Sequence, residues 1–137
     1  MPKYLARAAT HKAFKPVGSD DIQVVEMVAH CKVKITVLRR FKPSEVFKKP
    51  PVTHNLETCV RVYDGQEFIV GEDGKMPEGF CTSAWVSIYP NVRLLRFGGN
   101  YPWFKENGVA VNCCMDGLRP VIFKLERMRP ATGTLKS

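Results

Sequence analysis

The segment KVKITVLR, Lys32–Arg39, decides the fold class of this chain because its apolar and polar residues alternate. Val33, Ile35 and Val37 occupy every second position, which is the period of a β-strand with one buried face. The segment PVIFKLER, Pro120–Arg127, repeats this alternation near the other end of the chain. Both segments therefore predict strands of a sheet that is covered on one side.

Shorter elements are predicted between these two strands. A turn of helix is expected over Phe41–Phe47, where a proline near the start costs little. Three more segments are rich in β-branched or aromatic residues and are bounded by glycine, aspartate or asparagine, and they predict further strands. These segments are Thr58–Val62, Glu67–Val70 and Val109–Cys113. Ile22–Cys31 is compatible with either a strand or a short helix.

Phe80–Phe97 is the best helical segment of the chain. Its apolar residues fall at spacings of three and four and form one stripe, made of Trp85, Ile88, Val92 and Leu95. Pro90 interrupts this pattern, which predicts either a kink or two short helices. Gly98-Gly99 then ends the helix. The chain is therefore predicted to be an α+β protein, with a small, largely antiparallel sheet and one broken or kinked helix packed on it.

Length and composition predict one domain. The chain has 137 residues, of which 45% are hydrophobic, enough for a single core but not for two. We divide it into an N-terminal basic extension (1–31), a single domain (32–128) and a tail (129–137). Apolar runs are too short to span a membrane, and the basic N-terminus lacks the apolar core of a secretory signal. These features predict a cytoplasmic protein, and the limited core predicts a homo-oligomer.

The positive charge of the chain is concentrated in its first part. The net charge is +8, and residues 1–50 carry 11 basic and 4 acidic side chains. A basic segment can attract nucleic-acid phosphates, but no known nucleic-acid-binding motif accompanies it and no aromatic residues are interleaved with it. A nucleic-acid-binding or structural role is therefore only the second alternative.

Four segments, in fixed order, resemble a family of small bacterial and archaeal proteins known mainly by a numbered family label. They are GQEFIV (65–70), KMPEGFC (75–81), LRFGG (95–99) and CCMDGLRPVIFKLER (113–127), and the resemblance extends over about residues 32–128. It matches Cys59, Cys81, Cys114 and the pair Asp116-Gly117 to residues of the family pattern. Relatives often carry an acidic residue after the helix tryptophan, where this chain has Val86 and Ser87. The resemblance implies no established activity.

Five cysteines are the main chemical signal of the sequence. Their odd number and the lack of a CxxC pair argue against a disulfide scaffold and a zinc ribbon. Cys59, Cys81 and Cys114 each lie at a turn or element boundary, so their side chains could converge at one end of the sheet. One of them, above all Cys81 at a helix N-terminus, could be a thiolate nucleophile. Together they could instead bind Zn²⁺ or Fe²⁺, with His54 or a carboxylate as fourth ligand.

Other side chains complete the predicted site. Asp116 is a candidate catalytic residue beside Cys81 and Cys114, although Asp116-Gly117 could simply be a hairpin turn with Gly117 at positive φ. Arg119 could hold a carboxylate substrate or pair with Asp116. Trp85 and Trp103 could wall an apolar ligand pocket, although each cysteine and Trp85 could equally be core residues.

The best functional hypothesis from these residues is a small cysteine-dependent enzyme that acts on a compact, anionic metabolite. The alternative is an accessory protein that binds a metal or a small ligand. Substrate and reaction cannot be read from the sequence.

Overall fold

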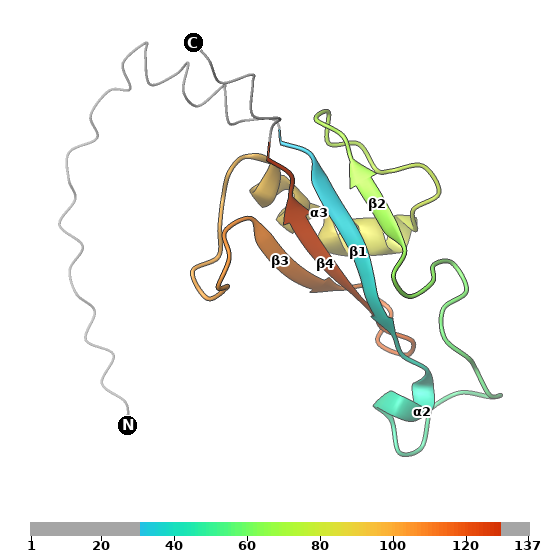
Figure 1. Ribbon diagram of the computed structural model, residues 1–137. Helices are drawn as coiled ribbons and strands as arrows, with labels where there is room; N and C mark the ends of the chain where they lie inside the picture. Colours follow the sequence, from blue (N-terminus) through green and yellow to red (C-terminus); the bar gives the residue numbers. More distant parts are fainter. Residues whose placement is uncertain (1–30, 130–137) are drawn as a thin grey trace, which may run out of the picture.

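The computed structural model describes residues 31–129, which form one antiparallel sheet with one main helix (Figure 1). The strand order is β2-β1-β4-β3, and α3 lies across one face of the sheet. In chain order the elements are β1 (Val33–Arg40), α2 (Pro43–Val46), β2 (Glu67–Val70), α3 (Thr82–Arg96), β3 (Val109–Cys113) and β4 (Val121–Arg127). The predicted α+β class with a helix packed on an antiparallel sheet is confirmed.

The register of the sheet follows from the alternation in β1 and β4. Ile35 of β1 lies opposite Phe68 of β2 on one side and Leu125 of β4 on the other. Val37 lies opposite Phe123. Because side chains alternate between the two faces of a strand, this register places the alternating buried residues of β1 and β4 together on the helix side.

The core lies between the sheet and α3. The helix turns its fully buried side chains toward the sheet, where each contributes about 1.5–3 kcal/mol by leaving water. They are Ile88, Val92 and Leu95, all 0% exposed. Phe80, just before the helix, closes one end of the core with an edge-on contact to Phe68, at 4.9 Å between ring centroids. Trp85 is only partly buried at the edge of this core.

Pro90 does not divide the helix. The structure has a single 15-residue helix that runs through Pro90, so of the two predicted alternatives, a kink or two short helices, the second is not formed. Pro90 is exposed, and its neighbours in the stripe, Ile88 and Val92, are fully buried. Packing of this stripe on the sheet therefore outweighs the one backbone hydrogen bond that proline cannot donate.

The predicted strand Thr58–Val62 is also wrong, because this segment is irregular. β2 pairs with β1 only as far as Thr36. Beyond this residue, the backbone groups on the same edge of β1 bind a turn and a side chain instead of a further strand. The backbone N–H of Arg40 donates to the carboxylate of Asp64 at 3.1 Å, where a strand would offer a carbonyl. Gly65 completes the turn with a φ of 84°, a value that glycine adopts without strain.

The remaining predictions about the ends of the chain concern residues outside the described part. These predictions are the strand or short helix over Ile22–Cys31, the N-terminal extension (1–31) and the tail (129–137). Of these residues, the structure describes only Cys31 and Arg129. Within residues 31–129, no helix has both the length and the apolar character needed to cross a bilayer.

Candidate functional site

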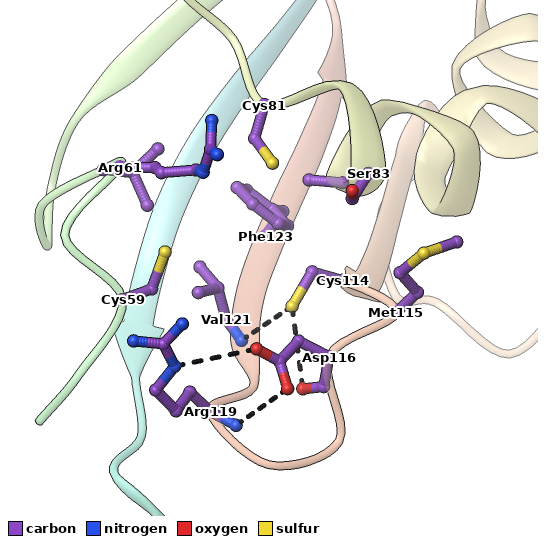
Figure 2. Close-up of a pocket in the computed structure, with 12 residues that line it drawn as sticks. Cys59, Arg61, Cys81, Ser83, Cys114, Met115, Asp116, Arg119, Val121 and Phe123 are labelled. Carbon is purple, nitrogen blue, oxygen red and sulfur yellow. Dashed lines mark hydrogen bonds and ion pairs between the residues drawn. The ribbon is translucent and has the colours of Figure 1, made fainter. Parts of the chain in front are cut away.

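A pocket of about 380 Å³ opens at one end of the sheet, where three separate segments meet (Figure 2). These segments are the irregular stretch 59–62, the start of α3, and the connection between β3 and β4. The volume is at the lower end of the ~300–1,000 Å³ typical of small-molecule sites, so a ligand would have to be compact. The lining residues with chemical functions are Cys59, Arg61, Cys81, Ser83, Cys114, Met115, Asp116 and Arg119.

The floor of the pocket belongs to the protein core. Val121 and Phe123 of β4 line it and are only 2% and 1% exposed. Their alternation along β4 points both side chains to the helix side of the sheet. In Figure 2 the three labelled cysteine sulfurs lie around these two residues. The site therefore rests on packed core residues, which hold its shape.

Cys81 lies at the start of α3. It is the N-cap residue, with an extended backbone, and its carbonyl accepts the Trp85 N–H at 2.9 Å. The Cys81 side chain makes no capping hydrogen bond. The first N–H groups of a helix have no partner within it, and they carry a partial positive charge. Because Ser83 and Ala84 also line the pocket, this positive end of α3 faces it.

Cys114 is held by backbone groups directly after β3. Its N–H donates to the Val121 carbonyl at 3.0 Å, and the Val121 N–H donates back to the Cys114 sulfur at 3.3 Å. The thiol also reaches the carbonyl of Asp116 at 3.9 Å. These contacts fix the sulfur at the pocket wall.

The adjacent Cys113 faces away from this pocket. Strand alternation turns it to the opposite side of the sheet, where it is exposed, and it does not line the pocket. Partial desolvation of its sulfur raises the pKa of the Cys113 thiol, and the neighbouring Cys114 thiol raises it further. Cys113 is therefore a thiol of ordinary or lower reactivity within the same chain.

Asp116 organises the loop between β3 and β4. Its carboxylate accepts the N–H groups of Leu118 and Arg119 at 2.9 and 3.2 Å, and it lies 3.7 Å from the Arg119 guanidinium. The predicted tight turn with Gly117 at positive φ is wrong, since Gly117 is not among the positive-φ glycines of the described residues. Instead, the Asp116 carboxylate holds the loop in place through its hydrogen bonds to two backbone N–H groups.

Arg61 is one of three functional pocket residues that the sequence analysis does not identify. It follows Cys59 by two positions, and this spacing alone does not show that its side chain turns toward the pocket. Ser83, which has the same spacing from Cys81, and Met115, which follows Cys114, were missed as well.

The two tryptophans do not reach this pocket. Trp85 packs on Phe80 and Tyr89, at 6.2 and 5.5 Å between ring centroids. Trp103 is 71% exposed and stacks on Tyr101 at 4.7 Å. Neither tryptophan lines the pocket, so the structure does not bring the predicted aromatic wall to the cysteines.

The geometry does not support the predicted metal site. Among the described residues, no three His, Cys, Asp or Glu side chains are placed so that they could hold a metal ion. His54, the predicted fourth ligand, lies outside the pocket lining and hydrogen-bonds to Thr53 at 3.0 Å. The three thiols thus share a pocket without forming a ligand set for Zn²⁺ or Fe²⁺.

Comparisons with known proteins identify no family for this chain. No protein-family model matches the chain, and no curated protein or solved structure matches it either. The resemblance to the small bacterial and archaeal family remains a prediction. The chemistry of the site is therefore inferred from its own residues.

Proposed function

We propose that this pocket is the site of a small cysteine-dependent enzyme that acts on a compact, anionic organic molecule. One observation carries the proposal: three free thiols and two guanidinium groups, from separate parts of the sequence, line a single pocket with a buried floor. The three cysteines also pack against the hydrophobic core, and their sulfurs border the pocket at the same time.

The charges around the pocket favour an anion. Arg61 and Arg119 line it, whereas Asp116 is the only carboxylate among its lining residues and is already hydrogen-bonded to the loop. The uncapped start of α3 adds partial positive charge. A carboxylate or phosphate group would complement this field, and guanidinium groups bind both kinds of oxyanion in a bidentate manner.

The lining residues also favour thiol chemistry. Of the lining side chains, the cysteines are the strongest nucleophiles, and the Ser83 hydroxyl has no histidine beside it in the pocket to act as its base. In the proposed step, a cysteine thiolate attacks an electrophilic carbon of the bound molecule. A C–S bond forms, and the electron pair of the broken bond departs with the leaving group.

Alkylation with iodoacetamide tests this proposal. The reagent forms a C–S bond and releases iodide, so the rate at each cysteine can be followed by peptide mass spectrometry at about pH 7.5. We expect at least one of Cys59, Cys81 and Cys114 to react faster than Cys113, the exposed thiol outside the pocket.

Inorganic phosphate provides the second arm of this experiment. If the pocket takes anions, phosphate should slow alkylation of the pocket thiols and leave the Cys113 rate unchanged. Pocket thiols that all react more slowly than Cys113 would contradict the enzyme. Protection by phosphate in the absence of a fast thiol would indicate the alternative, a binding protein without thiol chemistry.

A further inference from the structure

We infer that Arg61 recognises the anionic group of the molecule in this pocket, which makes a carboxylate or phosphate oxyanion the defining feature of the ligand. This inference rests on the proposed function and assigns its specificity to one residue. It starts from a difference among the arginines of the described residues.

Arg61 is the pocket arginine without a counter-charge. It has neither a hydrogen bond nor an ion pair within residues 31–129, although it lines the pocket. By contrast, three other arginines each lie within 4 Å of a carboxylate. These ion pairs are Arg39–Glu45, Arg40–Asp64 and Arg119–Asp116. Of the two pocket guanidiniums, only that of Arg61 therefore has no carboxylate within 4 Å among the described residues.

The backbone on both sides of Arg61 is anchored. The Cys59 carbonyl accepts a hydrogen bond from the Arg40 guanidinium at 2.8 Å, and the Val62 side chain is buried in the core at 5% exposure. Arg61 thus projects from a fixed backbone, while its own side chain has no partner. This arrangement lowers the ordering cost of binding, because only the side chain has to be immobilised.

The position of Arg61 relates the oxyanion to the thiols. Figure 2 shows its guanidinium extending from above Cys59 toward Cys81, whereas Asp116 lies below Cys114 and its partner Arg119 lies below Cys59. The only carboxylate in the lining is therefore at the end away from Arg61, where it is paired with Arg119. A bound oxyanion would face Arg61 and the positive start of α3 without a competing acid beside it.

Two alkylating reagents of almost identical shape isolate this interaction. Iodoacetate and iodoacetamide carry the same reactive CH₂–I group and differ only in the carboxylate. We expect the ratio of the iodoacetate rate to the iodoacetamide rate to be about fivefold higher at the fastest pocket cysteine than at Cys113. This is the effect of one charge at roughly 4 Å in a water-like medium.

Variants of the arginines then test the assignment. Arg61→Gln should reduce this ratio to that of Cys113, because the ratio cancels any change in the thiolate fraction that both reagents share. An unchanged urea midpoint shows that the variant is still folded. Arg61→Lys should retain part of the preference, since it keeps the charge but not the bidentate geometry. Arg93→Gln is the matched control, because it removes the same charge from an exposed position on α3 outside the pocket.

The outcomes separate this inference from the proposed function. If the unmodified chain shows no preference for iodoacetate at any pocket cysteine, both the anionic substrate and the role of Arg61 are wrong. If the preference persists in Arg61→Gln and disappears in Arg119→Gln, only the assignment to Arg61 is wrong. Competition by acetate and by inorganic phosphate, measured on the same cysteine, distinguishes a carboxylate site from a phosphate site.

Discussion

Replacing Arg40 by glutamine tests how the irregular wall of the pocket is held in place. At the end of β1, the Arg40 guanidinium donates to the Cys59 carbonyl at 2.8 Å and to the Asp64 carboxylate at 3.0 Å. These two bonds tie both ends of segment 59–64 to the sheet. The shorter, neutral side chain of glutamine removes the ion pair and the reach of the guanidinium.

The expected cost follows from the exposure of the partners. A hydrogen bond from a charged group to a carbonyl contributes about 1.5–3 kcal/mol, and the Arg40 side chain is only 23% exposed. The Asp64 side chain is 55% exposed, so solvent screens the ion pair and reduces its contribution to about 0.2–1 kcal/mol. We therefore expect Arg40→Gln to lower the free energy of unfolding by about 2 kcal/mol, which lowers the urea midpoint by about 1 M for a slope of ~2 kcal/mol/M.

Urea unfolding and cysteine labelling measure the two consequences of this change. The midpoint should fall, and the alkylation rate of Cys59 in the native state should rise because its backbone is released. Arg39→Gln is the control, since Arg39 pairs with Glu45 at a position where its side chain is 59% exposed. An unchanged midpoint together with an unchanged Cys59 rate would refute the role of Arg40 in positioning this wall.

Three other variants test the core, one turn and one thiol. Ile88→Ala should lower the unfolding free energy by about 2–5 kcal/mol, whereas Val86→Ala on the exposed side of α3 should change it by no more than ~0.5 kcal/mol; equal effects in urea would contradict the packing. Gly74→Ala should lower the thermal midpoint, because Gly74 has a φ of 72° and an added methyl would collide with the Arg96 guanidinium; an unchanged midpoint would contradict this geometry. Desolvation raises the pKa of Cys113 above its ordinary 9.0, so the stability it contributes is present below that pH and is lost as the pH rises through the folded-state pKa. Cys113→Ser should flatten this loss in urea titrations, and an identical pH dependence in both proteins would contradict it.

Local patterns were sufficient for the main elements of the fold. The alternation in Lys32–Arg39 and Pro120–Arg127 and the stripe of Phe80–Phe97 each describe one apolar face, and these faces pack together. The patterns failed where distant groups decide the backbone. Next to the irregular segment 58–62, the Asp64 carboxylate accepts the backbone N–H of Arg40, and the Arg40 side chain donates to the Cys59 carbonyl. These contacts join residues that are far apart in the sequence, so no local pattern shows them.

The same limit applies to the site. Cys81 and Cys114 could be predicted because they lie at the start of α3 and directly after β3, and such ends gather at one edge of a sheet. Cys59 was predicted from a strand that does not form, and it reaches the pocket from an irregular segment. Arg61 could not be predicted, since the direction of its side chain depends on the bend in this segment. Trp103 was included because a loop tryptophan is often a ligand contact, but its stacking on Tyr101 depends on how the loop folds, which no local period encodes.

The most direct test of the account is a crystal structure of the chain after reaction with iodoacetate. The account predicts a carboxymethyl group on the sulfur of Cys59, Cys81 or Cys114, with its carboxylate against the Arg61 guanidinium. A carboxymethyl group on Cys113 alone, with the pocket sulfurs unmodified, would contradict the claim that this pocket combines thiol chemistry with anion recognition.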